Sequence, residues 1–190
     1  STGTGLAGHN LGNLLLAAMN EITGDFVTAV KKLSGVLAVR GDVLPASTQS
    51  IRLLAEMEDG SIVVGESQIP LTGKRIKRVF LDPEDAVPLS EALLAIEEAD
   101  AILIGPGSLY TSILPNLLVR GLFDAVKRSP SPKLYICNVM TQPGETDGYT
   151  ASAHVEVMYR HVGSPFLDTV IVNSADIPAH VLEKYAEKGA

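Results

Sequence analysis

Three polar clusters in this sequence contain glycine, and they carry the residue types best suited to ligand chemistry. The first cluster is Gly8-His9-Asn10-Leu11-Gly12-Asn13, and the other two are residues 105–112 and 138–146. Amide, hydroxyl and imidazole side chains offer directional donors and acceptors, and glycines let a ligand approach the backbone closely. The sequence therefore directs attention to binding of a small polar ligand.

The second cluster follows a short apolar run at 101–104, which predicts a buried parallel strand covered on both faces. Ligands of open α/β sheets bind beyond the carboxyl ends of strands, and helix N-termini favour anions. We therefore expect a phosphate-bearing ligand here, and the expected contacts are Gly105, Pro106, Gly107, Ser108, Tyr110, Thr111 and Ser112. The alternative is a plain strand-to-helix turn capped by Ser108. The cluster is neither a P-loop nor a spaced Gly-x-Gly-x-x-Gly fingerprint.

The third cluster directly follows another apolar run, at 133–137, so a parallel sheet would bring it to the same edge. Its amides and hydroxyl suit recognition of a base or a sugar, and the candidates are Asn138, Thr141 and Gln142. A solvent-exposed loop closed by Pro143-Gly144 is the alternative.

The first cluster precedes a helix at 13–19 whose faces are nearly all apolar, and such a pattern predicts a buried helix. His9, Asn10 and Asn13 would present polar atoms at the positive end of that helix. The alternative is that Asn10 or Asn13 only caps it.

No set of residues identifies a catalytic centre or a metal site. His154 and His161 are seven residues apart and can share a helix face, but that spacing does not suit a chelating pair. There is no Gly-x-Ser-x-Gly elbow and no cysteine cluster. Glu145 and Asp147 stand near the expected site, either to hold a metal or polarise a hydroxyl, or simply as solvated acids.

The composition, with 46% hydrophobic and 19% charged residues among 190, is that of an ordinary globular domain. The formal net charge of −7 argues against nucleic acid as a partner. Cys137 is the single cysteine and stands in an apolar run, so we expect a buried, inert thiol and a cytoplasmic protein. No apolar segment is long enough to span a membrane, so no membrane partner is expected.

Residues 36–81 have an antiparallel strand texture, with a hairpin at Asp59-Gly60. Beyond Pro88, strand and helix signals alternate, with strands expected at 101–104, 133–137 and 168–173. This order predicts an α/β three-layer sandwich with a mostly parallel sheet and a small antiparallel subsheet. Because the chain opens with a loop and a helix rather than a strand, we expect a fragment that lacks an N-terminal βαβ portion.

The three polar clusters together resemble the YvcK family, whose members are also called gluconeogenesis factors and belong to the CofD-like superfamily, related to 2-phospho-L-lactate transferase. The similarity runs across nearly the whole chain, including Gly65-Glu66-Ser67 and Asp147-Gly148-Tyr149-Thr150. The resemblance implies one Rossmann-like, CofD-like domain over 1–190 in a cytoplasmic protein.

The resemblance also implies a regulator required for gluconeogenic growth and normal cell shape, which binds UDP-N-acetylglucosamine or a similar nucleotide sugar. Asn10, Asn13 and residues 105–112 and 138–142 would line that site. The alternative is a transferase acting on a phosphorylated substrate, with magnesium holding the phosphates. A homodimer or higher homo-oligomer is expected, and the strand edge within 51–81 is a candidate for the contact.

The sequence departs from the family in two ways. The family's opening strand with its Gly-Gly-Gly-Thr-Gly-Leu turn and the Asp-Asp-Gly-Gly loop have no counterpart, and those acids are where transferase relatives would hold metal. Ala153 also stands where the family pattern has Asp before His154-Val155. We therefore favour a regulator over an enzyme and leave the catalytic residues unassigned.

Overall fold

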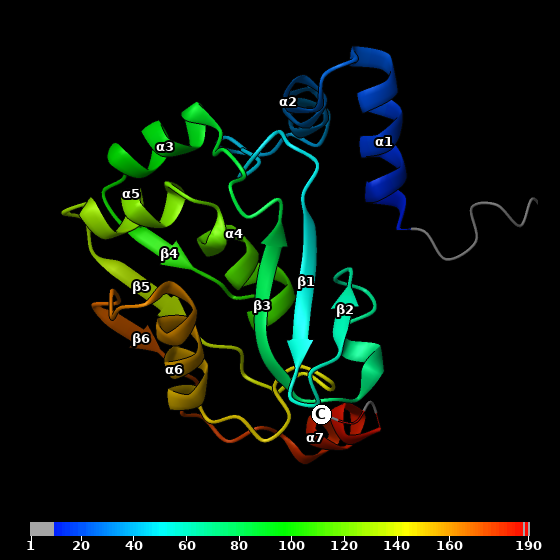
Figure 1. Cartoon of the computed structure of the whole chain (residues 1–190), viewed down its shortest axis with the longest axis vertical. Helices are drawn as coiled ribbons and strands as arrows, with labels where there is room; N and C mark the ends of the chain where they lie inside the picture. The colour runs from blue at the N-terminus through cyan, green and yellow to red at the C-terminus, as the bar shows by residue number, and fades with distance from the viewer. Residues whose placement is uncertain (1–9, 188, 190) are drawn as a thin grey trace, which may run out of the picture.

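The computed structural model describes residues 10–187 and 189, and it combines two three-stranded sheets with helices (Figure 1). Two short turns are not α-helical: η2 is 3₁₀ and η3 is a π-helical turn. In chain order the elements are α1 (Leu11–Thr23), α2 (Phe26–Val36), β1 (Arg52–Met57), β2 (Ile62–Val64), η2 (Pro70–Thr72), β3 (Ile76–Asp82), α3 (Ser90–Glu97), β4 (Ile102–Ile104), η3 (Leu109–Ile113), α4 (Leu114–Leu118), α5 (Leu122–Arg128), β5 (Lys133–Ile136), α6 (Ala151–Val162), β6 (Thr169–Ile171) and α7 (Ala179–Ala186).

The antiparallel sheet has the order β2-β1-β3, and its hairpin turns at Asp59-Gly60 as expected. Asp59 Oδ1 accepts a hydrogen bond from Ser61 N at 2.9 Å, and Gly60 takes a φ of +82°. The buried positions of β1 alternate along the strand, so one face packs on the core and the other faces outward. On the outward face, Glu56 pairs with Lys77 and Arg78 at 2.6 Å each.

The second sheet is parallel with the order β4-β5-β6, which confirms the predicted α/β alternation. Each sheet has three strands, and β1 and β3 are longer than any strand of the parallel sheet, so the antiparallel part is not the smaller of the two, contrary to what the sequence suggested. The prediction that the first parallel strand is covered on both faces is also wrong. Ile104 is buried, but Leu103 is 60% exposed, and β6 is exposed throughout.

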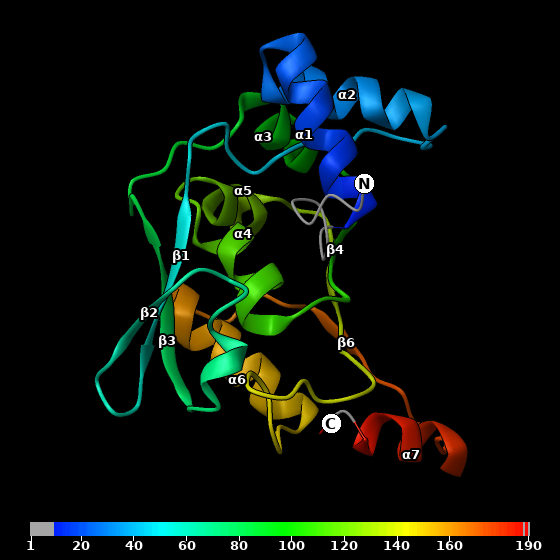
Figure 2. The same ribbon diagram turned by 90° about the vertical axis from the view of Figure 1, so that its right-hand side faces the viewer.

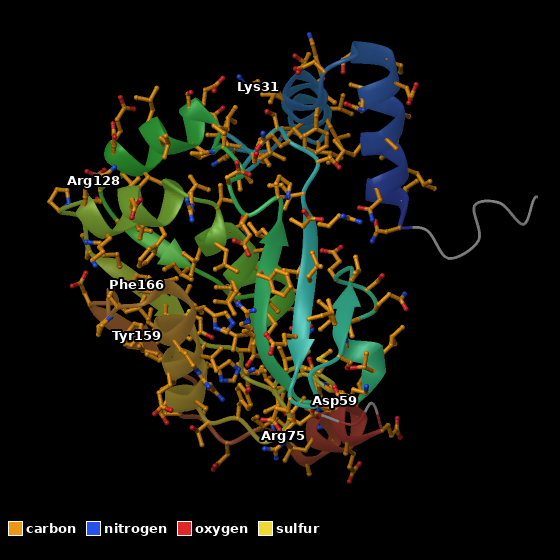
Figure 3. The ribbon with its side chains drawn as sticks, viewed as in Figure 1. Lys31, Asp59, Arg75, Arg128, Tyr159 and Phe166 are labelled. Carbon is orange, nitrogen blue, oxygen red and sulfur yellow. The ribbon has the colours of Figure 1, made fainter. Side chains whose placement is uncertain are left out.

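The layers run sheet, helices, sheet, with α4 and α6 between the antiparallel and parallel sheets (Figure 2). In the described residues, the helices therefore cover one face of the parallel sheet, where the sequence pattern predicted helices on both faces. Tyr110 of η3 and Tyr135 of β5 are fully buried in this central layer. Tyr159 of α6 packs edge-to-face on Phe166, with ring centroids 5.7 Å apart (Figure 3).

Helices α1 and α2 pack on each other at one end of the molecule, and α7 lies at the opposite end (Figure 1). The expectation of a buried first helix is wrong, because α1 has no buried residue and Leu11 and Ile22 are 70% and 78% exposed. Its nearly continuous apolar surface meets only α2 to a substantial extent. None of the helices in the described part of the chain has the length and hydropathy needed to cross a membrane.

Candidate functional site

The loops after β4 and β5 lie side by side because these strands are parallel neighbours. The Asn138 amide joins the two loops. Its Oδ1 accepts from Gly107 N at 3.2 Å, and its Nδ2 donates to Gly107 O at 2.8 Å. Gln142 adds a second link, since its Nε2 lies 2.6 Å from Ser108 Oγ. The second and third polar clusters of the sequence therefore form one structure at the carboxyl edge of the parallel sheet.

Gly105 makes the first turn of this structure feasible. Its φ is +81°, and a Cβ on it would lie 2.9 Å from Ile136 O of the neighbouring strand. Both the backbone conformation and the close approach therefore require glycine. The following peptide bond to Pro106 is cis.

Gly144 fixes the far side of the site. With a φ of +76°, it lies so close to η2 that a Cβ would come 2.1 Å from Pro70 O. The loop at 138–148 is thus packed directly against the connection between β2 and β3. Asp147 Oδ2 accepts from Gly144 N at 2.8 Å and holds the turn in place.

Glu145 occupies the start of η3, where the sequence predicted an anion. Thr111 Oγ1 donates to Glu145 Oε1 at 2.9 Å, and Tyr110 N donates to Oε2 at 3.3 Å. The carboxyl is 5% exposed, and burial raises its pKa, while the bonds from Thr111 and Tyr110 act in the opposite direction. This acid is neither solvated nor placed in a metal cluster. Instead, it uses donors of Tyr110 and Thr111 that the sequence assigned to a ligand.

Two neighbouring pockets open beside the glycine turn. One, of about 400 Å³, is lined by residues 103–107, 112, 113, 116 and 117. The other, of about 710 Å³, lies against the antiparallel sheet and shares Asn116 with the first. Its wall also includes Thr111, Arg52 and Gly65-Glu66, so this pocket lies between the segment after the turn and the antiparallel sheet.

A third pocket, of about 170 Å³, lies between the carboxyl ends of β5 and β6. Asn138 and Thr141 line it together with His154 and Asn173. Sequence reasoning placed His154 and His161 on one helix face but gave neither a function. Both lie on α6, and the environments of their ring nitrogens can only be known from the tertiary structure.

The described part of the first polar cluster, residues 10–13, lies away from this site. His9 lies outside the described residues. Asn10 is exposed and caps α1, because its Oδ1 accepts from Gly12 N at 2.8 Å. Asn13 is exposed in the first turn of the same helix, which stands away from β4 and β5 in Figure 1. Neither residue lines any of the three pockets described above.

The charged groups give little sign of a metal centre. Among residues 10–187 and 189, no three His, Cys, Asp or Glu side chains are grouped so that they could hold a metal ion. Cys137 is buried as a free thiol beside the third pocket. Lys74 pairs with Asp59 at 2.6 Å, and Lys77 and Arg78 share Glu56, so two carboxylates offset half of the positive charge of the basic run at 74–78.

Comparison with known proteins identifies relatives over almost the whole chain. The chain is 59% identical to the gluconeogenesis factors of Halalkalibacterium halodurans and Bacillus subtilis, each over 188 residues. These matches cover 99% of this chain and 58% and 59% of those proteins. A crystal structure of a UPF0052 family member from Bacillus halodurans superposes with a TM-score of 0.92 at 58% identity, over 98% of this chain and 60% of that one.

The chain thus spans about three-fifths of the length of these relatives. The model of the family described as 2-phospho-L-lactate transferase CofD matches residues 1–190. Together with the polar loops at the sheet edge, these matches confirm the resemblance seen in the sequence: the chain belongs to the CofD family and is a close homologue of the gluconeogenesis factors.

Proposed function

We propose that this chain is the nucleotide-sugar-binding part of a regulatory protein that supports gluconeogenic growth and cell shape. The observation that carries the proposal is the joining of the loops after β4 and β5 by Asn138 and Gln142. This junction rigidifies a polar edge at the carboxyl ends of parallel strands, the usual ligand position in open α/β sheets. The names of the relatives support the link to gluconeogenesis.

The size and chemistry of the pockets support a ligand of nucleotide-sugar dimensions such as UDP-N-acetylglucosamine. Pockets of about 400 and 710 Å³ fall within the usual range of about 300–1,000 Å³ for small-molecule sites. Ser108 lies on the turn next to the smaller pocket rather than in its wall, and because Gln142 Nε2 donates to Ser108 Oγ, its hydroxyl hydrogen remains available for a phosphate oxygen. Ser112, on the wall of the smaller pocket, provides a second hydroxyl.

The proposal also includes the type of sheet, the cellular location and the oligomeric state of the protein. We infer a Rossmann-like parallel sheet, a cytoplasmic location, and a homodimer or higher homo-oligomer that pairs through the edge strand β2. Magnesium would arrive with the ligand's diphosphate, since the described residues offer no three-ligand cluster. Light scattering at micromolar concentration tests the oligomer, and a single monomeric species would reject it.

A thermal-shift titration tests ligand binding. UDP-N-acetylglucosamine is compared with UDP-glucose, NADP and GDP, with and without magnesium. We expect a rise in Tm that follows RT ln(1 + [L]/Kd). The Ser108→Ala variant should lose most of the rise. Ser131→Ala is the matched control, because it also removes one hydrogen bond but at the opposite end of β5. No rise with any nucleotide sugar would reject the proposal.

The second candidate is a transferase, favoured by the family model's description. Phosphoryl-linked transfer generally relies on metal-held phosphates and a positioned acid or base. The buried Glu145 is already bonded to Tyr110 and Thr111. Incubation with a phosphorylated acceptor, a nucleotide donor and magnesium, followed by product analysis, separates the two candidates: turnover would favour the transferase.

A further inference from the structure

The pocket between β5 and β6 has an unusual wall for a polar site. Among the described residues, its lining contains no Lys, Arg, Asp or Glu, and its polar side chains include Asn138, Thr141, His154 and Asn173. Its volume of about 170 Å³ is less than half that of either pocket beside the glycine turn. The pocket therefore suits a single neutral ring rather than a phosphate or an entire nucleotide.

His154 supplies the one buried nitrogen in this wall that lacks a partner. The residue is 3% exposed, and its Nδ1 lies 2.8 Å from Thr150 O. A carbonyl only accepts hydrogen bonds, so Nδ1 carries the proton and neutral Nε2 presents a lone pair. Nε2 has no hydrogen-bond partner among the described residues. The Tyr149 ring packs edge-on against the imidazole at 5.5 Å and holds its orientation.

The amides of the same wall are already committed. Both polar atoms of Asn138 bond Gly107, and both polar atoms of Asn173 bond the backbone of Ala175. Each of these amides keeps one further N–H and one lone pair, but among the described residues His154 Nε2 and the Thr141 hydroxyl are the side-chain groups of this wall without any hydrogen-bond partner, since the Tyr149 hydroxyl bonds Tyr110. A buried acceptor without a partner costs free energy, so one retained beside a pocket points to a ligand donor.

We propose that this pocket binds a neutral polar ring whose O–H or N–H group donates a hydrogen bond to His154 Nε2. The ring would be the sugar or the base of the nucleotide sugar, so this proposal rests on the proposed function. Asn138 places the two subsites next to each other, because it lines the pocket while bonding Gly107 of the glycine turn. The phosphates would then lie at the turn, and the ring between β5 and β6.

Nε2 itself has almost no solvent-accessible surface, so the ring must shift a neighbouring side chain to reach it. Val139, on the same wall, is 58% exposed, so the rim of the pocket is not closely packed at this residue. A displacement of this kind is common when a ligand enters a mostly formed site.

Histidine side-chain ¹⁵N NMR provides a direct readout on the 190-residue chain. The probes are uridine, N-acetylglucosamine and UDP-N-acetylglucosamine, each added separately. We expect the Nε2 resonance of His154 to move when a ring donates to it, and the probe that moves it identifies base or sugar. His161 is the internal reference, because its Nε2 already accepts from Val79 N at 3.1 Å. If none of the probes moves the His154 signal, the proposal is overturned.

Two variants distinguish loss of the Nε2 acceptor from a general loss of folding. His154→Asn can still donate to Thr150 O but has no acceptor near the Nε2 position. His154→Gln places an amide oxygen there. We expect His154→Asn to weaken UDP-N-acetylglucosamine binding by about tenfold or more, and His154→Gln to weaken it less. His180→Asn on the exposed surface of α7 is the matched control and should bind normally.

The outcomes distinguish this proposal from the proposed function. Unchanged affinity in His154→Asn, with normal binding by the unsubstituted chain, would overturn the ring subsite and leave the nucleotide-sugar function standing. A His154 shift with uridine or N-acetylglucosamine alone, without any binding of the nucleotide sugar, would support the ring subsite and reject the nucleotide-sugar function.

Discussion

The two ends of α6 place similar histidines in different environments. His154 and His161 each direct Nδ1 to the carbonyl four residues earlier, at 2.8 and 2.7 Å, so both carry the proton on Nδ1. His161 then accepts from Val79 N and fastens α6 to β3, whereas Nε2 of His154, beside the third pocket, has no partner within residues 10–187 and 189. The local helix chemistry sets the tautomer, and the tertiary neighbours decide whether the second nitrogen is bonded within the fold.

A chain of aromatic contacts connects the two ends. His161 packs edge-on against Tyr110 at 5.9 Å, and Tyr149 packs edge-on against His154. The two tyrosines join through a hydrogen bond of 2.8 Å between their hydroxyls. Burial, with the hydrogen bond from Tyr149, raises the pKa of Tyr110, so this hydroxyl remains neutral. Substitutions in this series of aromatic residues can therefore test whether the two ends of α6 differ as described.

The largest effect on stability is expected at His161, which fastens α6 to β3. His161→Ala would leave the N–H of Val79, a residue that is 3% exposed, without its acceptor and open a space beside Tyr110. We expect a loss of about 2–3 kcal/mol in the free energy of unfolding, measured with urea. His161→Gln should recover part of it, and His180→Ala on α7 should change little. A loss of unfolding free energy smaller than that caused by His154→Ala would contradict the assignment of the stabilising role to His161.

Glu145 extends the comparison to a buried acid whose carboxyl oxygens both accept hydrogen bonds. Glu145→Ala should cost about 1–3 kcal/mol in urea unfolding, because Tyr110 N and Thr111 Oγ1 lose their acceptor. Since burial raises the pKa of Glu145, its contribution to stability is fully present below about pH 4.5 and is lost as pH rises through the folded-state pKa.

Glu145→Gln should remove this pH dependence, so its stability relative to the original chain should improve between pH 4.5 and 7. The exposed Glu156→Gln on α6 provides the control with the same chemical change. Parallel pH profiles for Glu145→Gln and the original chain would contradict the assignment of a raised pKa.

A smaller effect is expected where the two tyrosines meet. Tyr149→Phe keeps the ring against His154 but leaves the Tyr110 hydroxyl, in a residue that is 1% exposed, without its partner. The expected cost is about 1 kcal/mol in thermal or urea unfolding. Tyr185→Phe, on a residue that is 41% exposed, should leave stability unchanged. Equal effects of the two substitutions would show that the hydrogen bond between the two hydroxyls does not contribute to stability.

The smallest effect is the pH response of His161. Burial lowers its pKa, with help from Arg160 and Arg78, against the opposing bond to Val157 O. The contribution to stability is therefore present above about pH 6.5 and is lost as pH falls below that value toward the folded-state pKa. His161→Gln should flatten this part of the pH profile in urea titrations. A profile that keeps its slope in the variant would assign the response to another group.

Local patterns in the sequence predicted the elements that depend on local chemistry. The apolar run ending at Ile104, the Asp59-Gly60 turn and the alternation of strand and helix were sufficient for β4, the hairpin and the parallel sheet. The layer order was not predictable, because apolar periodicity does not say which face of a sheet another element covers. For the same reason, the apolar surface of α1 predicted burial that the structure does not show.

The sequence predicted the position of the polar loops in the fold but not their contacts. The sequence put Asn138 and Gln142 at the right edge, but their partners, Gly107 and Ser108, lie more than thirty residues away and follow only from the strand pairing. Glu145 illustrates the limit further. Loop acids are usually solvated, and only the tertiary structure shows this one bonded at the start of η3.

The contact between Gly144 and Pro70 has a mechanical consequence. Only a hydrogen atom fits between Gly144 and the Pro70 carbonyl, so Gly144 cannot move closer to η2. The contact therefore blocks movement of the loop at 138–148 toward η2 and sets no limit on movement away from it.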